Sequence, residues 1–331
     1  MDIALHVLFL IVGFVMLIKG ADFFIVSSSS IARKFNVSSL IIGLTLVAFG
    51  TSLPELAVSF AASISARAQG MTADIAMGNV IGSNVANLTL ILGFSAIMMP
   101  IAVRKSMYKK EFPFLIVITI LISVLAFFFQ SDAQIVWWEA LILLLFFAFY
   151  MYLMISSKKE VPEVEEIHVV DFKKALILLV IGIGGVSLGG YLVTTGAEFI
   201  AIELLVSSFS MSVTRATTLV GLSIVALGTS LPELVTSIMA AKKGENEIAL
   251  GNVVGSNVFN TLLIIGLSGL VTPLGINADV LIDTVIVIGI TLITIVFCFT
   301  GSKISKVEGW ILVAIYFSYI TYIILRALAI V

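Results

Sequence analysis

The sequence predicts an all-α integral membrane protein with ten transmembrane helices, arranged as two inverted repeats of five helices each. Three observations lead to this fold. Hydrophobic residues make up 60% of the 331 residues and charged residues only 11%, whereas soluble domains carry about 25% charged residues. The apolar residues are grouped into ten runs, each about as long as a membrane-spanning helix. Two segments of the first half recur in the second half with few changes.

The ten spans follow from apolar runs between polar breaks, because a helix needs about 20 mostly apolar residues to cross the hydrocarbon core. The runs are continuous rather than alternating, which favours helices over the strands of a membrane barrel. An acidic residue, Asp2, precedes the first run and no small-residue cleavage site follows it, so we interpret it as a span and not as a cleaved signal peptide. The predicted spans are 3–27, 38–62, 73–99, 112–130, 134–155, 174–200, 216–241, 247–271, 279–299 and 307–328.

Lysine and arginine are distributed unevenly between the predicted loops. Ten spans place both termini on one side, and the loops of the other side hold 14 of the 18 Lys and Arg residues. Because Lys and Arg stay in the cytoplasm, both termini are expected to be extracytoplasmic, in a multi-pass protein of the cell's inner or plasma membrane. The charged segment 156–173 is then a cytoplasmic linker between a first five-helix repeat, 1–155, and a second, 174–331.

Composition argues against several other classes of protein. No basic cluster suggests a nucleic-acid partner, and the lipid bilayer is the only partner that the composition requires, with no obligate protein partner evident. The single cysteine, Cys298, lies in an apolar run and is expected to be a small buried or lipid-facing side chain. No Cys/His spacing typical of a metal centre occurs, so no cofactor is expected. No plausible catalytic His, Cys or Ser–Lys pair lies at midplane, which argues against an intramembrane enzyme.

The internal repeat covers most of the chain. Residues 43–63 read GLTLVAFGTSLPELAVSFAAS and residues 221–241 read GLSIVALGTSLPELVTSIMAA, with 13 of 21 positions identical. Residues 78–99, GNVIGSNVANLTLILGFSAIMM, match residues 251–272, GNVVGSNVFNTLLIIGLSGLVT, at 12 of 22 positions. Because five spans are an odd number, the second half enters the membrane from the opposite side. Inverted repeats of this kind place a substrate site near the bilayer midplane and alternate access to it from the two sides.

Two glutamates, Glu55 and Glu233, lie inside apolar spans at equivalent places in the two repeats. A carboxylate in a membrane interior costs several kcal/mol, so it is a candidate functional group by default. The alternative is a structural ion pair, but no Lys or Arg lies in the neighbouring core spans. Two close carboxylates repel each other unless a cation sits between them. The pair therefore indicates a cation site where the two halves meet.

The residues before each glutamate supply further oxygen ligands. Pro54 and Pro232 break their helices, because a proline removes a backbone hydrogen bond. Freed carbonyls and hydroxyls are the hard oxygen ligands that Ca²⁺ takes. The alternative for the hydroxyls is a hydrogen bond within the kinked helix. The carbonyls are expected near Ala48 and Ala226, and the hydroxyls belong to Thr51, Ser52, Thr229 and Ser230.

The second repeated motif adds amides and hydroxyls to the candidate site. Residues four apart share one face of a helix, and each copy has such a face. For Asn84 and Asn257, which lie off this face, we expect hydrogen bonds between helices rather than ligation. The faces carry Asn79, Ser83 and Asn87 in the first copy and Asn252, Ser256 and Asn260 in the second.

At GTSLPE with GNVIGSNVAN, and again at GTSLPE with GNVVGSNVFN, the chain closely resembles the cation/calcium exchanger superfamily, in particular its prokaryotic-type Na⁺/Ca²⁺ exchangers. The resemblance covers essentially the whole chain. It implies antiport of Ca²⁺ against Na⁺ by alternating access, with the spans 3–27 and 174–200 sliding past the rest. It also implies one Ca²⁺ position surrounded by Na⁺ positions. The ligands would be the side chains of Glu55, Glu233, Thr51, Ser52, Thr229, Ser230, Ser83 and Ser256 and the carbonyls of Ala48 and Ala226, with Asn87 and Asn260 beside them.

The charge of this site bears on coupling. Potassium-dependent exchangers resemble this chain but have Asp where it has Asn260. Two ionised glutamates carry −2, which one Ca²⁺ neutralises, and the three Na⁺ that the resemblance implies would leave +1. We therefore predict exchange that does not depend on K⁺ and is electrogenic, with about 2.3 kcal/mol moved per charge per 100 mV.

Two alternatives to Na⁺/Ca²⁺ antiport follow from the same residues. Paired buried glutamates could bind protons when Ca²⁺ is absent, which would make the chain a H⁺/Ca²⁺ antiporter. A cation channel is a different class, but channels usually need several subunits around an axial pore or a ring of charges. The two internal repeats favour a self-contained carrier.

Overall fold

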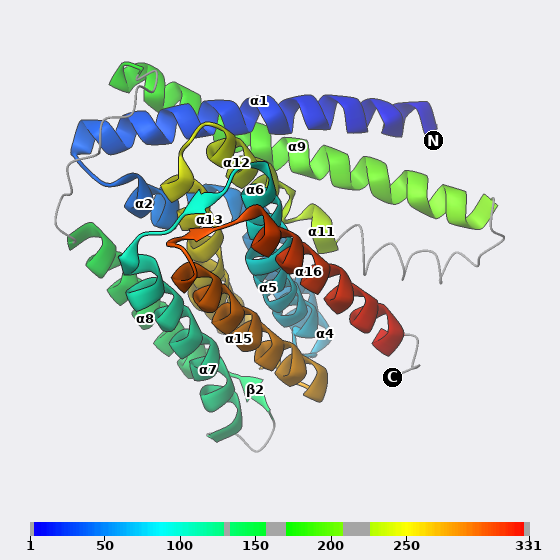
Figure 1. The fold of residues 1–331 in the computed structure, drawn as a ribbon. Helices are drawn as coiled ribbons and strands as arrows, with labels where there is room; N and C mark the ends of the chain where they lie inside the picture. Colours follow the sequence, from blue (N-terminus) through cyan, green and yellow to red (C-terminus); the bar gives the residue numbers. More distant parts are fainter. Residues whose placement is uncertain (1–2, 129–132, 157–169, 208–225, 328–331) are drawn as a thin grey trace.

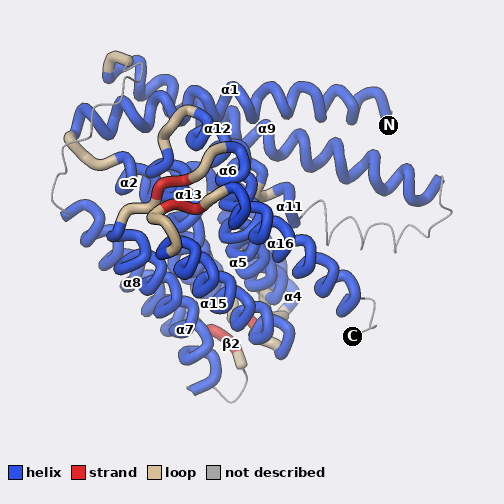
Figure 2. The backbone as a smooth tube through the Cα atoms, viewed as in Figure 1, coloured by secondary structure: helices blue, strands red, loops and turns tan. Residues whose placement is uncertain are grey.

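The computed structural model describes residues 3–128, 133–156, 170–207 and 226–327, which are almost entirely helical (Figures 1 and 2). Seven of the described helices are long and apolar enough to cross a membrane, and one bent pair makes an eighth span. This confirms a helical protein of several apolar spans.

Two of the predicted spans stand outside that count. The fourth, 112–130, corresponds to α7, Phe112–Phe128, a helix of 17 residues. The seventh, 216–241, begins among residues 208–225, which lie outside the described residues. The predicted linker, 156–173, is largely outside them as well: α8 ends at Ser156 and α9 begins at Phe172.

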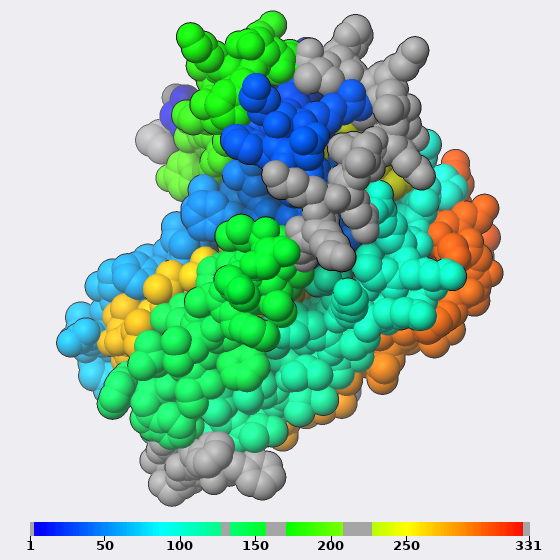
Figure 3. Space-filling model, turned by 90° about the vertical axis from the view of Figure 1, so that its left-hand side faces the viewer, coloured from blue at the N-terminus to red at the C-terminus, as the bar shows by residue number. Residues whose placement is uncertain are grey.

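Helices α1, Ile3–Phe35, and α9, Phe172–Ser207, form an antiparallel pair along one side of the other helices (Figures 1 and 3). Glycines bring the two backbones into contact. A Cβ atom added at Gly20 would lie 2.7 Å from the Val186 nitrogen, and one added at Gly182 would lie 2.7 Å from the Phe24 nitrogen. Small residues of this kind permit the close helix packing that membrane proteins use.

Both helices of this pair are longer than the spans 3–27 and 174–200 that the sequence predicts. The predicted end of the first span was set by a run of four serines, Ser27–Ser30. In the structure two of these hydroxyls bond within the helix, Ser27 Oγ to the Phe24 carbonyl at 2.8 Å and Ser30 Oγ to the Val26 carbonyl at 2.7 Å, and Ser29 Oγ donates to Glu245 Oε1 at 2.6 Å. The serines therefore continue the helix rather than end it.

The second predicted span, 38–62, is one bent rod. It comprises α2 (Ser39–Ile42), a π-helical turn η1 (Gly43–Val47), α3 (Ala48–Thr51) and α4 (Leu53–Gln69), and it bends by 48° at Ser52. The bend has a local cause, because Pro54 lies at the start of α4 and cannot donate a backbone hydrogen bond. The repeat has the same break at Ser230, between α11 (Ala226–Gly228) and α12 (Leu231–Lys242).

The centre of the molecule is formed by two long helices with π-helical turns in the middle. One consists of α5 (Asp74–Ala86), η2 (Asn87–Ile91) and α6 (Leu92–Met98), and the other of α13 (Asn246–Val258), η5 (Phe259–Ile264) and α14 (Ile265–Val271). Most of both helices is buried. A Cβ added at Gly251 would lie 2.9 Å from Gly43 Cα, so the second central helix packs directly on the bent rod.

The remaining helices cover these central ones (Figure 1). Two short strand pairs connect elements of the two halves: β1 (Ile101–Ala102) with β4 (Lys303–Ile304), and β2 (Gln134–Ile135) with β3 (Leu274–Gly275), all antiparallel. Cys298 is buried, as expected from its apolar run. The covering helices are η3 (Met107–Glu111) with α7, α8 (Trp137–Ser156), α15 (Ala278–Phe299) and α16 (Lys306–Ala327).

Candidate cation site

Glu55 and Glu233 occupy equivalent places in the first turns of α4 and α12, and each is only 1% exposed. Each carboxylate is held by a serine of the other repeat. Ser52 Oγ donates to Glu233 Oε1 at 3.0 Å, and Ser230 Oγ donates to Glu55 Oε1 at 3.1 Å. These serines are the residues at which the two helices break. The structure therefore brings together the two glutamates that the sequence singles out.

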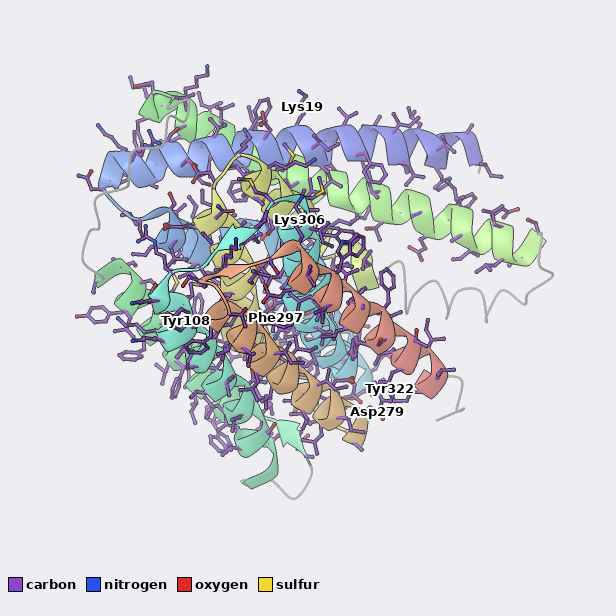
Figure 4. All side chains as sticks on the ribbon, viewed as in Figure 1. Lys19, Tyr108, Asp279, Phe297, Lys306 and Tyr322 are labelled. Carbon is purple, nitrogen blue, oxygen red and sulfur yellow. The ribbon has the colours of Figure 1, made fainter. Side chains whose placement is uncertain are left out.

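No fixed cation compensates this pair among the described residues. The ion pairs there involve other carboxylates, such as Asp22 with Lys243 and Asp283 with Arg326. Lys19, the one basic residue inside the first predicted span, is exposed and points away from the other helices (Figure 4). The amino termini of α4 and α12 favour negative charge in their first turns, but only by a fraction of a charge.

Arg326 belongs to a separate cluster at the far end of α15 and α16. Its guanidinium donates to both oxygens of Asp283, at 3.1 and 2.9 Å, and lies 5.2 Å from the centre of the Tyr322 ring. Figure 4 shows Asp279 and Tyr322 side by side there. This cluster ties α15 to α16.

Several buried oxygens around the two carboxylates have no hydrogen-bond partner among the described residues. A carboxylate and a hydroxyl oxygen offer lone pairs to a cation, and buried polar atoms without a partner require an explanation. Groups of three or more His, Cys, Asp or Glu side chains are absent from the described part, so a cation here would rely on two carboxylates and neutral oxygens. The unpartnered atoms there are Glu55 Oε2, Glu233 Oε2 and Thr229 Oγ1; the oxygens Asn87 Oδ1 and Asn260 Oδ1 of the two central helices are also unpartnered.

The two threonines before the breaks differ. Thr51 Oγ1 lies 2.9 Å from Asn252 Oδ1, 3.2 Å from the Val47 carbonyl and 3.3 Å from the Ala48 carbonyl. Thr229 Oγ1, its equivalent in the second repeat, is the unpartnered hydroxyl named above. Thr51 is thus within reach of carbonyls of its own helix, whereas the residue four positions before Thr229 lies outside the described residues.

The expectation that Pro54 frees the Ala48 carbonyl is corrected by the structure. The Ser52 nitrogen donates to the Ala48 carbonyl at 3.0 Å, so that carbonyl keeps its helical bond. The bond that the proline removes is the one to Gly50, four residues before it. A carbonyl oxygen has two lone pairs, and one of them remains at Ala48. The side chain of Ala226 lies outside the described residues; its backbone belongs to α11.

At Gly50 and Gly228, just before the threonines, a larger side chain would clash with residues of the α1–α9 pair. A Cβ at Gly50 would lie 2.6 Å from Phe24 Cζ, and one at Gly228 would contact the Thr194 side chain. Phe24 belongs to α1 and Thr194 to α9. The pair of long helices therefore rests against the broken segments next to the two carboxylates.

The serines of the second motif lie beside these hydroxyls. Ser83 Oγ is 3.3 Å from Ser230 Oγ, and Ser256 Oγ is 3.5 Å from Thr51 Oγ1. Both serines are buried. The structure thus places each predicted serine next to the broken segment of the other repeat.

The asparagines form a network between the central helices. Asn84 Nδ2 donates to Thr261 Oγ1 at 3.0 Å, and Asn257 Nδ2 donates to the Asn84 carbonyl at 3.4 Å. This confirms interhelical hydrogen bonds for Asn84 and Asn257. Asn87 Nδ2 donates to Asn257 Oδ1 at 2.9 Å, and Asn260 Nδ2 to Asn84 Oδ1 at 3.1 Å. These two bonds use amide nitrogens and leave the Asn87 and Asn260 oxygens available.

The sequence places Asn79 and Asn252 on the same helix faces as the two serines, but they are not among the predicted ligands. Asn79 Nδ2 donates to Ser59 Oγ at 2.9 Å and to the Glu55 carbonyl at 3.4 Å. Asn252 Nδ2 does the same with Ser237 Oγ and the Glu233 carbonyl, at 2.9 and 3.5 Å. The four-residue spacing to Ser83 and Ser256 predicts the shared helix face, but it does not predict that these amides bond to the backbone of the glutamates.

Comparison with known proteins decides the family. The family model for "Sodium/calcium exchanger protein" matches residues 5–156 and 174–325, two segments that together span most of the chain. The chain belongs to the sodium/calcium exchanger family. The resemblance at the two repeated motifs is thereby confirmed. As an exchanger the chain is a multi-pass membrane antiporter that exchanges Ca²⁺ for another cation, and the proteins it matches are transporters rather than enzymes.

Several full-length relatives are similar to this exchanger. The "Putative antiporter CaxA" of Alkalimonas amylolytica is 36% identical over 326 residues, which cover 94% of this chain and 96% of the relative. The "Sodium/calcium exchanger MaX1" of Methanosarcina acetivorans is 35% identical over 357 aligned positions, covering 96% and 98%. Among solved structures, the sodium-calcium exchanger NCX_Mj superimposes with a TM-score of 0.80 at 31% identity, covering 97% of this chain and all of the other.

Proposed function

We propose that this exchanger transports Ca²⁺ in exchange for Na⁺ by alternating access to a site between Glu55 and Glu233. The observation that carries the proposal is the exchange of hydrogen bonds between the repeats, in which Ser52 holds Glu233 and Ser230 holds Glu55. Two buried carboxylates without a fixed cation need a mobile one. A divalent ion with hard oxygen ligands fits two carboxylates among hydroxyls, carbonyls and amides.

The ligand set that we propose follows the sequence expectation. Glu55 and Glu233 bind both ions, and the neutral oxygens complete the Ca²⁺ and Na⁺ positions. The unpartnered buried oxygens support this assignment, because a bound cation would satisfy them. The neutral ligands are Thr51, Ser52, Thr229, Ser230, Ser83, Ser256, Asn87 and Asn260 by their side chains and Ala48 and Ala226 by their carbonyls.

We further propose ten spans in two inverted repeats, 1–155 and 174–331, with residues 156–173 between them. Paired features of the described helices support the repeat: the breaks at Ser52 and Ser230, and the strand pairs that join one half to the other. The distribution of Lys and Arg supports extracytoplasmic termini. The α1–α9 pair, which contacts both broken segments, is the unit that we propose to move between the two access states.

The charge of the site supports exchange that is independent of K⁺ and electrogenic. Asn260 is neutral and its amide is bonded to Asn84, so two carboxylates set the charge at −2. One Ca²⁺ balances that charge and three Na⁺ exceed it by one. A membrane potential then adds about 2.3 kcal/mol per 100 mV to each cycle.

The second candidate is a H⁺/Ca²⁺ antiporter, which the burial of both carboxylates favours. Flux measurements on purified protein in liposomes distinguish the two. A Na⁺ gradient at equal pH should drive uptake of radioactive Ca²⁺, and a pH gradient without Na⁺ should not. Uptake driven by the pH gradient alone would replace Na⁺ coupling by proton coupling.

A further inference from the structure

Asn252 connects three parts of the site. Its side chain is completely buried in α13. The amide nitrogen donates to Ser237 Oγ and the Glu233 carbonyl in α12, and the amide oxygen accepts from Thr51 Oγ1 in α3 at 2.9 Å. One side chain of the second repeat thus fixes the backbone at one carboxylate and a hydroxyl of the other repeat.

The bond to Asn252 decides where the Thr51 hydroxyl proton goes. A threonine hydroxyl has one proton and two acceptor lone pairs. Four acceptors lie within reach of that proton, and Asn252 Oδ1, at 2.9 Å, is closer than the Val47 and Ala48 carbonyls, at 3.2 and 3.3 Å, and Ser256 Oγ, at 3.5 Å. Donation to the helix carbonyl is the usual choice of a threonine in a helix. Here the amide oxygen offers a shorter bond.

The outcome of this competition matters for the Ala48 carbonyl. One of its two lone pairs already accepts the Ser52 nitrogen at 3.0 Å. If Thr51 donated to the same oxygen, both acceptor positions would be filled by protons, and the carbonyl could not bind a cation. When the Thr51 hydroxyl donates to Asn252 instead, the second lone pair of the Ala48 carbonyl and the lone pairs of Thr51 remain available to bind a cation.

The first repeat contains the matching asparagine without the matching bond. Asn79 makes the same two donor contacts, to Ser59 and the Glu55 carbonyl. No bond between Thr229 and Asn79 is found among the described residues, however, and Asn79 is only partly buried. In this conformation the bond between a threonine and the asparagine of the other repeat is therefore found for Thr51 only, in the part of the chain that the structure describes.

We propose that Asn252 is a positioning residue for cation binding. By accepting the hydrogen bond of the Thr51 hydroxyl it directs oxygen lone pairs of Thr51 and Ala48 to the cation held by Glu233. Asn252 itself does not touch the ion. This inference rests on the proposed function, because it assumes that the cation binds between the two glutamates.

A double-mutant cycle tests whether Asn252 acts through Thr51. Ca²⁺ binding to the purified full chain in Na⁺-free detergent solution is measured by titration calorimetry for Asn252→Ala, Thr51→Val and the double variant. Asn252→Ala removes three hydrogen bonds, of which the one to Thr51 orients a proposed ligand, and loss of that orientation should weaken Ca²⁺ binding about fivefold to tenfold. In the Thr51→Val background the same change should cost less than about twofold, because the hydroxyl that Asn252 orients is gone.

Asn79→Ala, alone and with Thr51→Val, is the matched control. It removes the equivalent amide without touching the Thr51 bond, so its effect should be the same in both backgrounds. A fivefold to tenfold loss for Asn252→Ala in both backgrounds would overturn the proposal. If wild-type protein bound no Ca²⁺, the proposed function would fail instead, so the two failures are distinguishable.

Because Asn252 is completely buried, its alanine variant can fail to fold, which thermal unfolding would reveal. Ser237→Ala then takes its place, since Ser237 accepts the amide that orients Asn252. Its effect on Ca²⁺ binding should be smaller, about twofold to fivefold, and should again disappear with Thr51→Val. An equal loss in both backgrounds would overturn the proposal here too.

Discussion

Ser52 Oγ donates a hydrogen bond of 3.0 Å to Glu233 Oε1, although the two residues lie 181 positions apart in the chain. The second repeat returns the contact, from Ser230 to Glu55, at 3.1 Å. Each serine also lies at the break between the two helices of its own span. The serine at the break in one half therefore binds the carboxylate of the other half. A substitution of that serine should affect the glutamate of the opposite repeat.

This reciprocity predicts similar effects for Ser52→Ala and Ser230→Ala. Each variant removes the hydroxyl donor of a buried carboxylate, and such bonds to charged groups are worth about 1.5–3 kcal/mol. We expect each to reduce the kcat/KM of Ca²⁺ transport about tenfold or more. Transport assays in liposomes measure this. A strong effect of one serine with none of the other would contradict the reciprocal site.

Asn260→Asp should change the ion dependence of transport. The substitution makes the site charge −3, and it replaces the amide nitrogen that donates to Asn84 Oδ1 at 3.1 Å by an oxygen. The extra negative charge should recruit a monovalent cation beside Ca²⁺, so Ca²⁺ uptake by the variant should increase when K⁺ is added. Wild-type protein serves as the control and should not respond to K⁺. Equal K⁺ responses in both proteins would show that charge counting does not explain the coupling.

The glycine contacts between α1 and α9 predict a strong position dependence along α9. Gly189→Val should separate the helices, because a Cβ there would lie 2.7 Å from the Leu17 nitrogen. Overpacking of this kind costs about 1–3 kcal/mol. Gly184→Val is a control on the same helix, where an added Cβ meets nothing within 4 Å. Thermal unfolding in detergent should show a lower midpoint for the first variant only, and equal midpoints would argue against close backbone contact.

The ion pair between Asp22 of α1 and Lys243 of the α12–α13 turn joins the long pair to the rest of the molecule at 2.5 Å. Both side chains are about one third exposed, so the pair should contribute at most about 1 kcal/mol. Lys243→Asp should therefore change the transport rate by less than about fivefold, and adding Asp22→Lys should restore it. A loss that the exchanged pair does not restore would mean that Lys243 acts through another contact.

The helical spans and the importance of the two glutamates could be predicted from the sequence, because both follow from the free energy of placing single residues in a membrane. Long apolar runs are stable in the hydrocarbon core of the bilayer. A carboxylate inside such a run is unfavourable and therefore indicates a functional group. The sequence did not predict that α1 continues past Ser27, because the hydroxyls of Ser27 and Ser30 bond to carbonyls of their own helix.

Contacts between the repeats could not be predicted from either repeat alone. The bond of Thr51 to Asn252 and the missing bond of Thr229 depend on how α13 packs on α3 in one conformation. The sequences around the two threonines are almost the same, so they predict the same hydrogen bonds for both hydroxyls. The expectation that Pro54 frees the Ala48 carbonyl is wrong for a local reason, since that carbonyl keeps its bond to the Ser52 nitrogen despite the proline two residues later.

The central claim is that Glu55 and Glu233 bind the transported Ca²⁺, and flux in liposomes tests it most directly. Ca²⁺ uptake driven by a Na⁺ gradient is compared for wild type, Glu55→Gln and Glu139→Gln. Glu139 is a matched control, a buried glutamate that accepts the Val136 nitrogen at 2.9 Å near the start of α8. We predict that Glu55→Gln folds but abolishes uptake while Glu139→Gln retains it. Full uptake by a folded Glu55→Gln variant would contradict the account.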